Sequence, residues 1–145
     1  MPAKNFRGVA VLFAVLLATA TFACAKKPLP GALSVPGNQT WTDTGLDIEA
    51  NSVITVKASG QVFANPTDSG GPDGINSRPE WNDYRVTPKA AYAALIGKVG
   101  RNGLPFVVGQ EHSVRVIHTG RLFLGVNDKD TADNKGEFKA VVTVK

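Results

Sequence analysis

The sequence predicts an all-β fold, a small jelly-roll type β-sandwich of about eight antiparallel strands. Apolar and β-branched residues alternate with polar residues in several short runs, which is the period of a half-buried strand. After the first 30 residues no long apolar stretch follows the helical period of 3.6. The 145 residues include 15 Gly and 9 Pro, which suits many turns, and the length is that of one domain.

The expected strands come from alternating runs and from shorter apolar runs. The clearest alternation occurs at 53–58, 114–118, 122–126 and 138–145. Shorter runs at 33–35, 41–46, 91–96 and 106–108 complete the set. Turn-forming residues separate the runs at 51–52, 59–60, 101–103, 119–120 and 135–136.

Residues 1–25 are predicted to be a signal peptide. Lys4 and Arg7 precede an apolar stretch at 9–17, and small residues follow at 18–25. The apolar stretch is too short for a stable transmembrane span. Without these two cations the 16 basic and 12 acidic residues become 14 and 12, so the net charge falls from +4 to +2. We therefore expect an exported protein that is periplasmic, secreted or membrane-anchored.

Two forms of the mature N-terminus remain open. Residues 23–25 fit a small-x-small cleavage site, which gives a mature start at Lys26. Cys24, the single cysteine, also stands where a bacterial lipoprotein carries its lipidated first residue, and lipidation would attach the chain to a membrane. In both cases residues 26–32 are predicted to be a linker and 33–145 the folded domain.

Composition and motifs exclude several classes of function. The chain is 43% hydrophobic and 19% charged, which favours a packed core over disorder. It has no basic run with interleaved aromatic residues, so we expect no nucleic-acid partner. His112 and His118 lack the spacing of a zinc site and have no nucleophile at a recognisable spacing, so we expect no enzyme of those types.

A long loop at 65–86 interrupts the strand pattern. It contains Gly and Pro but little apolar periodicity, and loops of this length are usually functional or disordered. Trp81 and Tyr84 argue against disorder. We therefore expect an ordered loop with a functional role.

An acidic loop at 127–134 joins two expected strands and is the best candidate for chemistry. Its eight positions hold three carboxylates and two amides, and a calcium ion with several oxygen ligands would relieve the repulsion between them. The loop is not an EF-hand, because Asp133 stands where that loop needs Gly and Lys139 where it needs Glu. The alternative is an ordinary solvated hairpin in which Lys129 and Lys135 offset the charge.

Several motifs in order resemble the calcium-dependent galactose-binding lectin family typified by the Pseudomonas galactophilic lectin. The motifs are WTDTGL at 41–46, VITVKASG at 53–60, GPDG at 71–74, ALIGKVG at 94–100 and the acidic loop with Gly136 and Phe138. The resemblance extends over nearly all of 41–145. It implies a galactose-binding-domain-like sandwich in which one calcium ion is completed by sugar hydroxyls.

The resemblance also implies a ligand set. Asp128, Asp133 and Asn134 match side-chain ligands of calcium, with Asp133 standing where the family has asparagine. Two backbone carbonyl ligands fall near Ala64 and Thr131. The loop is two residues shorter than in the family, so Asp130 is an alternative to Thr131.

The sugar-contacting positions depart more from the family. Asp128, Lys129 and Asp133 are the expected contacts from the acidic loop. Arg78 replaces a histidine and Trp81 replaces a glutamine, which leaves an arginine that can donate to hydroxyls and an indole that can stack on a sugar ring. The alternatives are a surface arginine and a tryptophan that fixes the loop to the core.

Three functions follow from these residues. The first is an exported, non-catalytic, calcium-dependent carbohydrate-binding module whose ligand is galactose-like, with oligomers or a crowded membrane supplying multivalency. The second is a structural or interaction domain of the cell envelope that kept the fold and lost sugar binding. The third is a hydrolase in which Asp73 or Glu80 faces the acidic loop.

Overall fold

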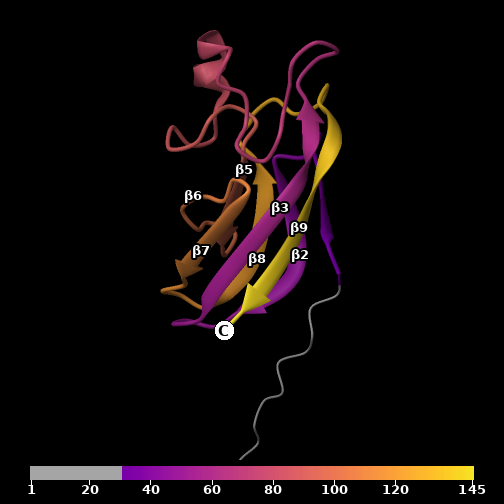
Figure 1. Cartoon of the computed structure of the whole chain (residues 1–145). Coiled ribbons are helices and arrows are strands. Elements are labelled where there is room, and N and C mark those ends of the chain that lie inside the picture. Colours follow the sequence, from indigo (N-terminus) through magenta and orange to yellow (C-terminus); the bar gives the residue numbers. More distant parts are fainter. Residues whose placement is uncertain (1–30) are drawn as a thin grey trace, which may run out of the picture.

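Residues 31–145, described here in a computed structural model, form two antiparallel sheets, so the predicted all-β sandwich is confirmed (Figure 1). Nine strands build the sheets: β1 Leu33–Pro36, β2 Trp41–Ile48, β3 Val53–Phe63, β4 Ser69–Gly70, β5 Leu95–Val99, β6 Phe106–Val107, β7 Glu111–Arg115, β8 Gly120–Val126 and β9 Lys135–Val144. The predicted signal peptide, Cys24 and most of the predicted linker lie outside the described residues. Within 31–145 no helix has the length and apolar character needed to cross a membrane.

The two sheets differ in size and in strand order. The five-stranded sheet has the order β1-β9-β3-β4, and β7 also pairs with β3. The four-stranded sheet has the order β2-β8-β5-β6. The longest ladder joins β3 to β9, from Ile54 opposite Val144 to Phe63 opposite Lys135. The end of β3 and the start of β9 therefore lie side by side at one end of the sandwich (Figure 1).

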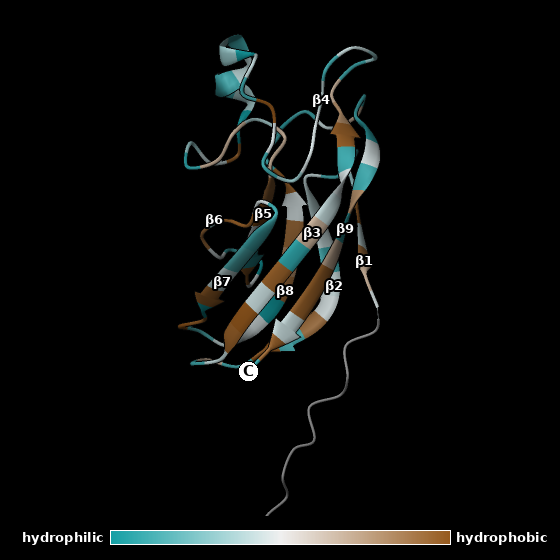
Figure 2. Ribbon diagram, in the orientation of Figure 1, coloured by the Kyte–Doolittle hydropathy of each residue, from teal (hydrophilic) through white to brown (hydrophobic). Residues whose placement is uncertain are grey.

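The core lies between the sheets and follows the alternation read from the sequence. In β9 the buried positions are Phe138, Ala140 and Val142, while the intervening residues are exposed. In β8 Leu122 and Leu124 are fully buried and face the same core. Burial of apolar side chains is the main favourable contribution to folding. Brown and teal segments alternate along the strands for this reason (Figure 2).

Two expected strands were placed wrongly. The strand expected at 114–118 is β7 at Glu111–Arg115, because Val116 forms its backbone hydrogen bonds with Asn51 and Ser52 in the adjacent turn. The strand expected at 91–96 begins at Leu95, because Ala93 has a φ of 56° and the chain turns there. The apolar run before β5 is buried all the same, since Ala90 and Ala94 join Ile96 in a second, smaller cluster.

Two expected turns are in fact positions inside strands. Gly60 lies in β3 and Gly136 in β9, with φ values of 97° and 79°. A Cβ at Gly60 would stand 2.4 Å from the carbonyl oxygen of Glu137, and one at Gly136 would stand 2.3 Å from that of Gln61. Glycine is therefore required because the backbone of the paired strand and the positive φ leave no room for a Cβ, and not because the chain reverses there.

The long loop is ordered, as expected, and contains two short elements that the sequence did not predict. These are the two-residue strand β4 and the 3₁₀ helix η1, Pro79–Tyr84. Proline at the start of η1 has a φ suited to a helix, and none of the helix residues is buried. The loop and the β8–β9 connection both lie at the end of the sandwich opposite the C-terminus (Figure 1).

Candidate functional site

Asn127 fixes the beginning of the acidic loop. It follows the last residue of β8 and is fully buried. Its Oδ1 accepts a hydrogen bond from the backbone N–H of Thr87 at 2.8 Å. Its Nδ2 lies 2.9–3.0 Å from the carbonyl oxygens of Thr87, Ala90 and Ala91. One amide side chain thus joins the acidic loop to the end of the long loop.

Asp128 is a fully buried carboxylate at the centre of the loop. Its Oδ2 accepts hydrogen bonds from the Tyr92 hydroxyl at 2.7 Å and from Asn134 Nδ2 at 2.9 Å. Its Oδ1 accepts one from the backbone N–H of Asp130 at 2.9 Å. Among residues 31–145 no ion pair involves Asp128. A buried carboxylate without a cation is costly, and among the described residues these three hydrogen bonds are what offsets that cost.

Asn134 is buried beside Asp128, with 4% of its surface exposed. Its Nδ2 donates to Asp128 Oδ2 and, at 3.2 Å, to the carbonyl of Gly37. These two bonds fix the amide so that Oδ1 is its free end, and that oxygen is buried without a hydrogen-bond partner among the described residues. A buried oxygen of this kind is commonly completed by an ordered water or by an ion.

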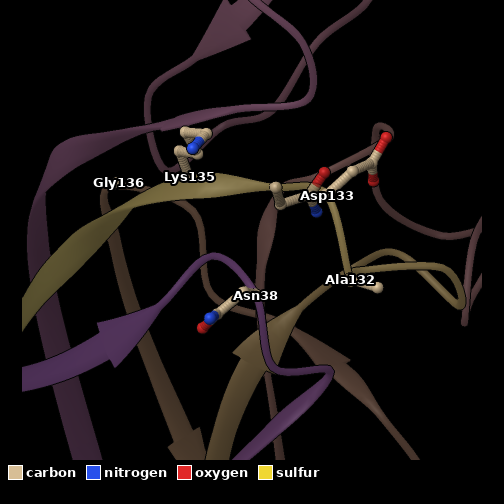
Figure 3. A pocket seen from close by; sticks show the side chains of 6 residues that line it. Asn38, Ala132, Asp133, Lys135 and Gly136 are labelled. Carbon is tan, nitrogen blue, oxygen red and sulfur yellow. The ribbon is translucent and has the colours of Figure 1, made fainter.

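A pocket opens where the acidic loop meets the β1–β2 connection (Figure 3). The exposed Asp133 forms part of its wall, and Asn38 reaches it from the opposite segment. The full lining is Asn38, Ala132, Asp133, Asn134, Lys135 and Gly136. An adjoining pocket shares the last part of this wall and adds Phe63, Asn65 and Pro66. The backbone at Ala64, between two of these residues, is therefore placed beside the acidic loop.

The remaining residues of the predicted loop set have partners within the protein. The carbonyl of Thr131 accepts a hydrogen bond from the backbone N–H of Asn134 at 3.1 Å. The backbone N–H of Lys129 donates to the carbonyl of Tyr84 at 2.8 Å, and its Nζ donates to the carbonyl of Asp83 at 3.1 Å. Lys129 therefore ties the acidic loop to the end of η1.

Arg78 is held by contacts inside the long loop, and Trp81 is held by contacts with Arg78 and with the core. Arg78 forms two hydrogen bonds with Asp68, from Nε to Oδ1 at 2.8 Å and from Nη2 to Oδ2 at 2.9 Å. Its guanidinium lies 5.4 Å from the centre of the Trp81 ring. The Trp81 ring packs against the core and lies 5.1 Å from the ring of Tyr92. The interpretation of Trp81 as a residue that fixes the loop to the core agrees with this packing.

The Asp68–Arg78 pair predicts an acid-sensitive loop. Hydrogen bonds from Arg78, and then from Asn65, lower the pKa of Asp68 to about 2, below its value in an unfolded chain. Because the folded state binds this proton less readily, the stability that Asp68 contributes is present above about pH 4 and is lost as pH falls towards 2. We expect the melting temperature of Asp68→Asn to fall less steeply than that of the wild type between pH 4 and 2. Equal slopes would contradict this assignment, and thermal scans monitored by circular dichroism measure them.

The residues of the acidic loop supply part of a ligand set for a hard cation such as calcium. Within 31–145 there is no group of three or more His, Cys, Asp or Glu side chains that could hold a metal ion. A ligand set here must therefore combine few carboxylates with amide and carbonyl oxygens, which calcium accepts. Asp128 supplies an uncompensated buried charge, and Asn134 Oδ1 supplies an unpartnered buried oxygen. Both features are consistent with calcium ligands.

Comparison with solved structures finds the same fold in a lectin domain. One matching structure is described as the EclA N-terminal domain, a PllA-like lectin, and it superposes with a TM-score of 0.63 at 24% sequence identity. The match covers 81% of this chain and 98% of that domain. This chain has a lectin-domain fold. At this identity the likeness concerns the fold, and no family model and no curated protein matches the sequence.

Several residues of the site were missed by sequence reasoning. Tyr92 and Asp68 contact predicted site residues but lie 36 and 10 positions away from them in sequence. Asn38 lines the pocket from the β1–β2 connection. Tyr92 was assigned to an expected strand, and nothing in its local pattern indicates that its hydroxyl would meet a carboxylate. Asn127 was counted in the acidic loop, but the contacts of its amide depend on residues 87–91 folding against it.

Proposed function

We propose that this chain is a non-catalytic carbohydrate-binding domain of an exported protein and that it binds sugar through a calcium ion. Two neighbouring observations carry the proposal. The Asp128 carboxylate is buried without a cation, and Oδ1 of Asn134, a residue that lines the pocket, is buried without a hydrogen-bond partner among the described residues. The lectin-domain fold and the resemblance of the motifs support the same function.

In this proposal Asp128 and Asn134 hold the calcium ion together with Asp133 and carbonyl oxygens near Ala64 and Thr131. Calcium, when bound, supplies a positive charge with open coordination positions that sugar hydroxyls can fill. Asp133 is exposed on the pocket wall, where its carboxylate can accept hydrogen bonds from a bound sugar. The sugar class suggested by the resemblance is galactose-like. One shallow site would bind weakly, so useful avidity requires several copies or a crowded membrane surface.

Calorimetry tests both steps of the proposal. We expect calcium to bind the wild-type chain, and a panel of monosaccharides to show binding that disappears when a chelator is added. Asp133→Ala should lower the affinity for calcium by about tenfold or more, because it removes an oxygen ligand and a charge. Glu49→Gln is the matched control, since it removes an exposed carboxylate from the β2–β3 turn at the other end of the sandwich. Absence of calcium binding to the wild type would reject the proposal.

The commitment of Arg78 to Asp68 favours one alternative, an envelope interaction domain that keeps calcium and no longer binds sugar. Nε and Nη2 of Arg78 both donate to the Asp68 carboxylate, so these two nitrogens are not available to sugar hydroxyls. A glycan array probed with and without calcium separates the two functions. A reproducible calcium-dependent glycan signal would eliminate the alternative, and calcium binding without any glycan signal would favour it.

A further inference from the structure

Tyr92 contacts the candidate metal carboxylate from outside the acidic loop. It lies before β5, its side chain is buried, and its backbone forms a bridge with Ile75. Its hydroxyl donates to Asp128 Oδ2 at 2.7 Å. A tyrosine hydroxyl is neutral at physiological pH, so Tyr92 is a hydrogen-bond donor to this carboxylate.

The hydrogen bonds of Asp128 leave one side of the carboxylate free. A carboxylate has about four acceptor positions, two on each oxygen. Both positions on Oδ2 are used, by Tyr92 and Asn134. On Oδ1 one position is used, by the backbone N–H of Asp130. The position that remains is on Oδ1, and Asn134 Oδ1 is the other free acceptor.

Tyr92 is itself held by a row of contacts from the long loop. The Trp81 ring lies 5.1 Å from the Tyr92 ring at an interplanar angle of 58°. The Arg78 guanidinium lies 5.4 Å from the Trp81 ring, and Asp68 fixes that guanidinium through two hydrogen bonds. Tilted aromatic pairs and cation–π contacts are both favourable at these separations. The row runs from the start of the long loop to Asp128 without a break.

We propose that Tyr92 is a positioning residue for Asp128, and that Trp81 and Arg78 act on the site through Tyr92 rather than by contacting the sugar. The inference rests on the proposed calcium function of Asp128. By occupying Oδ2 together with Asn134, the Tyr92 hydroxyl restricts the rotation of the carboxylate and leaves the remaining acceptor position on Oδ1. Partners of metal ligands fix ligand orientation in this way, and their loss typically lowers metal affinity by about 10- to 100-fold.

The test is a calcium titration of Tyr92→Phe, which removes one hydroxyl and keeps the ring. We expect the dissociation constant for calcium to rise by about tenfold or more. Tyr84→Phe is the matched control, because the Tyr84 side chain is half exposed and forms no hydrogen bond among the described residues. Circular dichroism checks that each variant is folded. Trp81→Phe provides a second variant that keeps the hydroxyl and weakens the packing behind it, and we expect a smaller loss of calcium affinity.

Arg78→Ala separates positioning from sugar contact. If Arg78 acts through Tyr92, calcium affinity falls in the absence of any sugar, whereas a sugar-contacting arginine would change only sugar affinity at saturating calcium. Tyr92→Phe and Arg78→Ala variants that bind calcium as tightly as the wild type would overturn the inference. If the wild type binds calcium but no glycan, the sugar-binding proposal fails. The calcium titration of Tyr92→Phe then still tests whether Tyr92 positions Asp128. If the wild type binds no calcium, both proposals are rejected.

Discussion

Asn127→Ala is expected to lower the free energy of unfolding by about 3–5 kcal/mol. The substitution leaves the Thr87 N–H and the carbonyls of Thr87, Ala90 and Ala91 without their partner in a fully buried position. Each buried polar group left unsatisfied costs about 1–3 kcal/mol. The change is a large part of the total stability of an ordinary domain, which is about 5–15 kcal/mol. Urea denaturation in calcium-free buffer measures it.

Asn127→Asp is the informative companion variant. It keeps an oxygen that can accept from the Thr87 N–H, but it replaces the donating amide by a second acceptor facing three carbonyl oxygens. We expect it to be at least as destabilising as Asn127→Ala, because it also buries a charge. A loss below about 1 kcal/mol in either variant would show that the long loop does not depend on this amide.

The sandwich could be predicted from the sequence because alternation in strands is a local signal. Residues such as Leu122 and Leu124 in β8, or Phe138 and Ala140 in β9, are two apart and share one buried face. The wrong boundaries arose where tertiary contacts override that signal. Gly60 and Gly136 look like turn residues in isolation, and only the antiparallel pairing of β3 with β9 explains them as strand positions.

The candidate site was predictable only in its contiguous part. Asp128 and Asn134 stand six residues apart in one loop, and their hydrogen bond falls inside the predicted set. Arg78 was identified as a position of interest, but its partner Asp68 could not be read from local spacing. Tyr92 meets Asp128 because the pairing of β5 with β8 continues beyond the strands, through backbone hydrogen bonds of Asn127 with residues 93 and 94. Contacts of this kind depend on the fold, so a single sequence carries no signal for them.

Asp128→Asn is expected to abolish most of the calcium affinity while leaving the calcium-free fold almost unchanged. The carboxylate is the buried formal charge of the proposed ligand set, and we expect the dissociation constant to rise by about 100-fold or more, since ligand charge tunes calcium affinity. Removal of a buried charge favours the folded state. Against this, the new amide nitrogen would face the backbone N–H of Asp130 as a second donor. These effects oppose each other, so we expect a stability change below about 1 kcal/mol without calcium.

The decisive comparison is the stability gain on adding calcium. At a free calcium concentration of 100 times its dissociation constant, the wild type should gain about 2.7 kcal/mol, whereas Asp128→Asn should gain almost nothing. Paired thermal or urea unfolding with calcium and with chelator measures this difference, and Glu49→Gln serves again as the control with a full gain. If Asp128→Asn instead loses several kcal/mol in chelator and keeps the wild-type gain with calcium, Asp128 is a structural carboxylate. In the proposed site the charge of Asp128 meets a cation only when calcium is bound, and this role would account for a fully buried carboxylate at that position.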